Sequence, residues 1–187
     1  TLSNKGLALY NLERYDEAIT YFDKVLEIDP TYVDALINKG TALDGLERYD
    51  EAIVYYDKAL EIEPNDTDTL SNKGLALYNL ERYDEAIVYY DKALEIDPNY
   101  LNALINKGTA LDGLERYEEG IEYYDKVLEI DPTYVDALIN KGGDLDTLER
   151  YDEAITYHDK VLEIDPNNED ALNNKAFTLT NLGRNGE

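Results

Sequence analysis

Residues 33–66 read VDALINKGTALDGLERYDEAIVYYDKALEIEPND. The same pattern returns every 34 residues along the 187-residue chain, and prolines mark it at Pro30, Pro64, Pro98, Pro132 and Pro166. A fixed period of this length is typical of proteins that stack one supersecondary motif in a line. The chain is therefore expected to form one elongated array, with its function on a surface and not in a cleft.

Each half of the period carries small and apolar side chains three or four residues apart. In residues 33–66 they are Leu36, Gly40, Leu43 and Leu46, followed by Ala52, Tyr56, Ala59 and Leu60. This spacing gives a helix one apolar face. The sequence thus predicts two helices per repeat, A and B, joined by the polar Glu47-Arg48 turn. Eleven helices are expected in all, the last of them over Glu169–Leu182.

The start of helix A shows a capping pattern. Thr31 precedes Asp34 by three residues, and the same spacing links Asn65 with Asp68, Thr133 with Asp136 and Asn167 with Asp170. In a capping box the first of the two side chains satisfies a free backbone N–H of the new helix. We therefore expect capping boxes, with helix A starting just after each proline.

Glycine occupies position 8 of every full repeat, at Gly6, Gly40, Gly74, Gly108 and Gly142. Inside a helix each copy costs about 1 kcal/mol relative to alanine. Close approach of helix A to helix B would explain why it recurs. Gly143-Asp144 and Gly120 depart from the residues of the sibling repeats, and they predict that residues 108–150 open first.

Composition limits the partners of the chain. The 42 acidic residues exceed the 17 basic ones, which gives a net charge of −25 and opposes binding to nucleic acid or an anionic membrane. A protein partner, if charge matters for binding, would then be basic. The favoured explanation of the charge is an acidic surface that keeps an extended array soluble and monomeric. Most acids are expected on helix B and in turns, where they face water. The absence of cysteine favours a cytoplasmic setting.

The repeats divide the chain as 1–32, 33–66, 67–100, 101–134 and 135–168, followed by a capping helix over 169–183. Together they are expected to form a single array over residues 1–187. The first residue already lies inside the pattern, and a sixth repeat has only begun when the sequence stops. We interpret the sequence as a segment of a longer protein or as a trimmed one.

The repeat resembles the tetratricopeptide repeat (TPR), and the resemblance covers the whole chain. Its characteristic residues stand here as Gly40, Ala52, Tyr56, Ala59 and Pro64. The resemblance implies an all-α fold, a right-handed α-solenoid superhelix in which A helices line a concave groove and B helices face outward. It also implies a scaffold for peptides or proteins and not an enzyme.

Position 7 departs from the family, because it holds lysine where leucine is usual. The lysines are Lys39, Lys73, Lys107, Lys141 and Lys175. We expect each lysine to lay its aliphatic stem on apolar surface and to pair with a neighbouring acid.

Position 6, which the resemblance places in the groove, is asparagine throughout: Asn4, Asn38, Asn72, Asn106, Asn140 and Asn174. A carboxamide both donates and accepts hydrogen bonds, so a column of them suits the backbone of an extended peptide. Similar asparagine ladders grip peptides in some TPR superhelices. Alternatively, these side chains bond to the adjacent A helix or were simply copied when repeats duplicated.

Other groove positions alternate with a period of 68 residues. Repeats one and three present Tyr10 and Tyr78, whereas repeats two and four present Thr41, Thr109, Asp44 and Asp112. A peptide would then meet tyrosine-lined and aspartate-lined positions in turn, with Lys or Arg favoured near the aspartates and near Asp146. Duplication of a two-repeat block explains the same alternation without a ligand.

Other functions lack the residues that they need. Lys or Arg at positions 2, 5 and 6, which related co-chaperones use to hold a carboxylate tail, is missing from this chain. His158 replaces an aromatic residue and is expected to pack in the core, since no nucleophile accompanies it. The cluster at 65–68 lacks the glycine and glutamate of a calcium loop. We expect no catalytic residue, no metal and no cofactor.

The sequence therefore predicts a non-catalytic scaffold that binds an extended peptide or protein segment through the asparagine ladder. The competing hypothesis is a structural or self-assembling protein whose terminal repeats stack or swap with those of other copies. The chain is expected to be a monomer, or a weak homo-oligomer that associates through its terminal repeats. Exposed apolar edges at the ends of a solenoid favour the second hypothesis. Dependence of the mass on concentration would support it.

Overall fold

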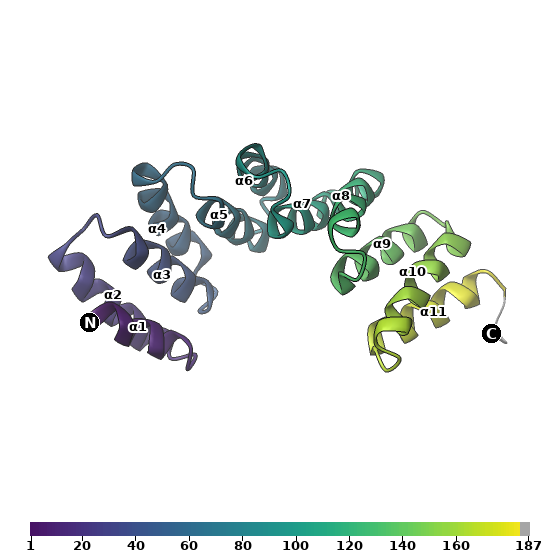
Figure 1. The fold of residues 1–187 in the computed structure, drawn as a ribbon, viewed down its shortest axis with the longest axis horizontal. Helices are drawn as coiled ribbons and strands as arrows, with labels where there is room; N and C mark the ends of the chain where they lie inside the picture. The colour runs from purple at the N-terminus through teal and green to yellow at the C-terminus, as the bar shows by residue number, and fades with distance from the viewer. Residues whose placement is uncertain (184–187) are drawn as a thin grey trace. The chain divides into compact units, whose positions relative to one another are not determined.

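A computed structural model describes residues 1–183, which form eleven helices and no strand (Figure 1). The helices are α1 (Leu2–Tyr10), α2 (Tyr15–Ile28), α3 (Val33–Asp44), α4 (Tyr49–Ile62), α5 (Thr67–Asn79), α6 (Tyr83–Ile96), α7 (Leu101–Gly113), α8 (Tyr117–Ile130), α9 (Val135–Thr147), α10 (Tyr151–Ile164) and α11 (Glu169–Asn181). The odd-numbered helices are the A helices of the repeat, and the even-numbered ones are the B helices. The predicted all-α repeat fold and the number of helices are confirmed.

The chain forms two compact units, Thr1–Tyr100 and Leu101–Glu187. In the N-terminal unit three hairpins, α1/α2, α3/α4 and α5/α6, stack on one another. In the C-terminal unit α7/α8 and α9/α10 stack in the same way, and α11 packs against α9 and α10. The boundary between the units coincides with the end of the third repeat.

The two helices of a hairpin meet at the position-8 glycine. A methyl group on Gly40 would lie 2.6 Å from the ring of Tyr56, whose side chain is completely buried. The other hairpins repeat this contact between Gly6 and Phe22, Gly74 and Tyr90, Gly108 and Tyr124, and Gly142 and His158. The predicted close approach of A and B is confirmed, and the ring at position 24 is its cause.

The position-7 lysines join successive repeats. Lys39 on α3 donates to Asp23 of the preceding hairpin and to the hydroxyl of Tyr55 of its own hairpin, at 2.8 Å for the latter. Burial alone would lower the pKa of Lys39, but its hydrogen bonds to Asp23 and Tyr55 outweigh that effect and raise the pKa. Equivalent ion pairs join Lys73 to Asp57, Lys141 to Asp125 and Lys175 to Asp159. The predicted packing and pairing of these lysines is confirmed.

The capping boxes predicted at the start of helix A are wrong. Tyr32 holds the N-cap position of α3 and makes no side-chain capping bond. Thr31 instead donates its backbone N–H and its hydroxyl to Asp29, so its side chain is occupied by the turn. In α5 and α11 the cap lies one residue later than predicted: Asp66 accepts from the N–H of Thr69, and Asn168 accepts from the N–H of Ala171.

A left-handed residue closes every A-to-B turn. Glu13, Glu47, Glu81, Glu115 and Glu149 have φ between 57 and 58°. Side chains other than glycine pay about 1–2 kcal/mol in this region, because Cβ approaches the following carbonyl oxygen. Each hairpin therefore holds one strained residue at a point where glycine would be unstrained.

The pair Gly142 and Gly143 offers a direct test of the close approach. Gly142→Ala should destabilise the chain by about 1–3 kcal/mol, because its methyl group would overlap the ring of buried His158 at 2.6 Å. Gly143→Ala should stabilise it by up to about 1 kcal/mol, since a Cβ there meets nothing within 4 Å. Urea unfolding of both variants measures the difference, and equal midpoints would refute the explanation.

Glu47→Gly should raise stability by about 1 kcal/mol or less. Glycine removes the strain at φ 58° but adds conformational freedom to the unfolded chain. Glu47→Ala is the matched control, because it removes the same charge and keeps the strained backbone. If both variants shift the thermal midpoint equally, charge and not backbone conformation explains the effect.

Candidate binding surface of the A helices

The A helices approach one another more closely than the B helices do. Within the N-terminal unit α3 contacts both α1 and α5, and within the C-terminal unit α9 contacts both α7 and α11. The backbones of successive B helices do not come this close to one another within either unit of the described chain. Each unit therefore brings its A helices together on one side, where their side chains share a surface.

The asparagines of position 6 lie on these A helices. Asn38 and Asn72 are half-buried, as are Asn106, Asn140 and Asn174, whereas Asn4 is exposed. Within residues 1–183 none of these six side-chain amides forms a hydrogen bond to protein. The amides are thus held partly inside the surface, with donors and acceptors left over.

The alternating positions 9 and 12 are more deeply engaged. Tyr10 packs its ring 5.4 Å from that of Tyr15, and Tyr78 lies 5.3 Å from Tyr83. The hydroxyl of Thr41 donates to the carbonyl of Ile37 at 3.0 Å in its own helix, and Thr109 bonds to Ile105 in the same way. These side chains border the surface, and their polar or aromatic groups already have partners.

Asp44 and Asp112 turn their carboxyl groups into their own hairpins. The hydroxyl of Tyr56 donates to Asp44, and that of Tyr124 donates to Asp112. Burial raises the pKa of Asp44 to about 6, although the bond from Tyr56 works against this shift. Asp44, which was predicted to meet a basic ligand, is therefore already bonded to Tyr56, whose ring sets the spacing between the two helices of the hairpin.

A buried carboxyl pair in the C-terminal unit was not foreseen from the sequence. The carboxyl groups of Asp112 of α7 and Asp144 of α9 both lie beside Gly120, and Asp144 is only 5% exposed. Burial and the neighbouring Asp112 charge raise the pKa of Asp144 to about 8. Gly120 of α8 makes room for the pair, since a methyl group there would overlap Asp112 Oδ1. The two departures, Gly120 and Asp144, thus have one structural explanation.

His158 is packed in the core, as predicted. Its side chain is fully buried, with Nε2 2.9 Å from Asp146 Oδ2. The hydroxyl of Thr178 on α11 donates to the same oxygen at 2.9 Å. Asp146 therefore joins the α9/α10 hairpin to the last helix, and the histidine replaces the tyrosine hydroxyl of other repeats.

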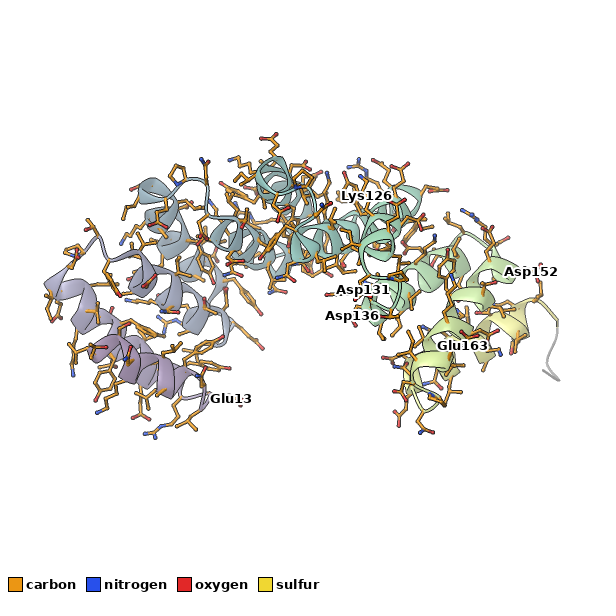
Figure 2. The ribbon with its side chains drawn as sticks, viewed as in Figure 1. Glu13, Lys126, Asp131, Asp136, Asp152 and Glu163 are labelled. Atoms are coloured by element: carbon orange, nitrogen blue, oxygen red, sulfur yellow. The ribbon has the colours of Figure 1, made fainter. Side chains whose placement is uncertain are left out.

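Many acidic side chains lie on the B helices and in turns. Figure 2 shows Asp152 and Glu163 near the two ends of α10 and Glu13 in the turn after α1. Across the described part of the chain, His, Asp and Glu do not gather into a group of three that could hold a metal ion. Every helix within residues 1–183 is too short or too polar to cross a bilayer.

Comparison with protein families identifies the repeat. Tetratricopeptide-repeat models match residues 1–64, 67–100, 101–134, 135–168 and 159–187, which together span nearly the whole chain. The chain belongs to the tetratricopeptide-repeat family. A search of curated proteins found no match.

Solved structures share the fold. YrrB, described as a TPR protein with an unusual peptide-binding site, is 28% identical, with a TM-score of 0.76 over 93% of this chain and 90% of its own. MamA from Desulfovibrio magneticus RS-1 is 24% identical, with a TM-score of 0.82 over 90% of this chain and 95% of its own. A TPR protein from Parabacteroides merdae is 20% identical, with a TM-score of 0.85 over 98% of this chain and 73% of its own. The last two establish the fold alone.

The link between Gly120 and Asp144 predicts that the effect of Gly120→Ala on stability changes sign when Asp144 is replaced. Gly120→Ala should destabilise the parent chain, because the methyl group displaces the buried Asp112 carboxyl. In an Asp144→Ala background Asp112 is free to turn away, so Gly120→Ala should stabilise by up to about 1 kcal/mol. Four urea titrations complete the cycle, and additive effects would disprove the link.

The carboxyl pair also predicts a dependence on pH. Folded Asp144 keeps its proton up to about pH 8, whereas an unfolded aspartate loses it near pH 4. The folded state binds more protons in this window, so Asp144 lowers stability progressively as the pH rises from about 4 to about 8. Asp144→Asn should match the parent near pH 4 and exceed it near pH 8 in thermal unfolding. A difference independent of pH would contradict this.

Proposed function

We propose that the chain is a non-catalytic scaffold that binds an extended segment of another protein along its A helices. The observation that carries the proposal is the set of position-6 amides, which have no protein partner and are half-buried on α3 and α5 of the N-terminal unit and on α7, α9 and α11 of the C-terminal unit. Because these amides are only partly covered and have no protein partner, their donors and acceptors are open to the backbone of an extended peptide.

Family and charge support the same proposal. TPR domains are generally interaction modules, and YrrB is a relative described by its peptide-binding site. The net charge of −25 favours a basic partner and disfavours nucleic acid and anionic lipid. We place this scaffold in the cytoplasm, with neither cofactor nor metal.

The test measures peptide affinity. Peptides selected from a random library against the immobilised protein are labelled, and their Kd values are compared by fluorescence anisotropy. The variant Asn38→Ala/Asn72→Ala/Asn106→Ala should weaken peptides of unrelated sequence at least tenfold, because the amides contact backbone. The matched control Asn65→Ala/Asn99→Ala/Asn167→Ala removes as many amides from exposed turns. It should leave the affinity unchanged.

Two outcomes would reject the proposal. Equal losses in the ladder variant and the turn control would mean that the amides are not a binding site. A mass that grows with concentration in sedimentation, together with an unaltered ladder variant, would support self-association through terminal repeats instead. Exposed apolar side chains such as Ile28 and Phe177 would then be the place to mutate.

A further inference from the structure

A pocket of about 320 Å³ opens on the A-helix surface between α9 and α11 of the C-terminal unit. Its lining includes Gly143 and Asp146 of α9 and Asn174 and Phe177 of α11. Glu149 of the turn after α9 and Tyr151, the first residue of α10, also line it. One of these residues, Asn174, belongs to the asparagine ladder. The pocket therefore adjoins the surface on which the proposed function depends.

Gly143 creates this space. The same position holds Leu7, Thr41, Leu75 and Thr109 in the preceding repeats, and Phe177 in the following helix. A Cβ placed on Gly143 meets no atom within 4 Å, so the room that a sibling side chain would take is empty. Among the five full repeats, this site alone has lost the side chain at position 9.

The walls of the pocket combine aromatic rings with carboxylates. Phe177 is 59% exposed although it is a large apolar residue, and Tyr151 is half-buried beside it. Glu149 is an exposed carboxylate at the rim. The lining includes no Lys or Arg that could neutralise these acids.

Asp146 is the more deeply buried of the two carboxylates that line the pocket. Its side chain is 8% exposed, and its Oδ2 is occupied by His158 and Thr178. Its Oδ1 is buried and has no hydrogen-bond partner within the described residues, which is also true of the equivalent oxygens of Asp44 and Asp112. A buried carboxylate oxygen without a partner is costly unless a ligand supplies a donor.

The ligand must therefore be a cation that also has an apolar face. A guanidinium group fits this description, because it stacks flat on aromatic rings and donates to carboxylates through several N–H groups. A lysine ammonium is a strongly hydrated point charge and makes less use of the rings. Anionic groups are excluded by Asp146, Glu149 and the overall charge.

We propose that the pocket formed by Gly143, Asp146, Glu149 and Phe177 binds an arginine side chain of the peptide held on the A helices. This inference rests on the proposed function, and it gives that function a sequence preference. The asparagine ladder would hold the backbone in any peptide. The pocket would fix the position at which arginine is required.

The test uses a small probe that lacks a peptide chain. N-acetyl-arginine-N-methylamide is titrated into the ¹⁵N-labelled protein at low ionic strength, and amide shifts are followed by NMR. N-acetyl-citrulline-N-methylamide has the same shape without charge, and the lysine analogue has the charge without the flat face. Saturable shifts at Gly143 and Phe177 with arginine, at least fivefold tighter than with either analogue, are expected.

Gly143→Thr restores the side chain of repeats two and four, and should abolish the saturable shifts. It keeps the net charge, and no neighbour obstructs the new Cβ, so the fold is retained. Gly143→Ala fills less of the pocket and should weaken binding less, while Phe177→Ala should weaken it several-fold. Equal binding of the three analogues, or arginine binding unchanged in Gly143→Thr, would overturn the inference.

The ladder and the pocket can fail separately. If the Asn38→Ala/Asn72→Ala/Asn106→Ala variant binds peptides normally but Gly143→Thr no longer binds the arginine probe, the pocket proposal is supported and the ladder proposal is rejected. If the affinity of library peptides depends on the ladder, but the peptides show no preference for arginine and bind Gly143→Thr equally well, the ladder proposal is supported and the pocket proposal is rejected.

Discussion

The contact between glycine at position 8 and the ring at position 24 sets the geometry of every hairpin. Because the ring of Tyr56 lies where a Cβ of Gly40 would be, the A helix rests directly on an aromatic face. The rest of the buried interior consists mainly of alanine and leucine, with a few valine and isoleucine side chains. The same contact directs the ring hydroxyl toward position 12, and this draws Asp44 into the hairpin. One close approach therefore determines the packing of a repeat and the polarity of its inner edge.

The C-terminal unit varies this arrangement through substitutions that compensate for one another. Asp144 replaces a small residue and brings a second carboxyl group to Asp112, while Gly120 gives up a methyl group to accommodate both. His158 takes the place of a tyrosine and finds Asp146 at the position of its hydroxyl partner. Near-identical repeats thus tolerate buried polar groups when neighbouring positions change together.

The repeating part of the structure was predictable because each local signal recurs in phase. Helix number, the role of Gly40 and the pairing of Lys39 follow from residue types and spacing. The capping pattern misled, because Thr31 had an equally good local partner in Asp29. The Asp112–Asp144 pair and the pocket at Gly143 could not be predicted, since both depend on how one repeat meets the next. The only signal in the sequence was that Gly120, Gly143 and Asp144 depart from the repeat. That signal did not indicate which residues these positions would contact.

The bonds of the position-7 lysine also bear on how the number of repeats in this chain can change during evolution. Lys39 bonds backward to Asp23 and within its own hairpin to Tyr55, and Lys73 reproduces both bonds one repeat later. The junctions at Lys39 and Lys73 use the same three positions, so a copied or deleted repeat of this kind rejoins its neighbours with the lysine-to-acid link intact. Such an array can change its length by genetic recombination without redesigning an interior. Its number of repeats is a quantity on which selection can act.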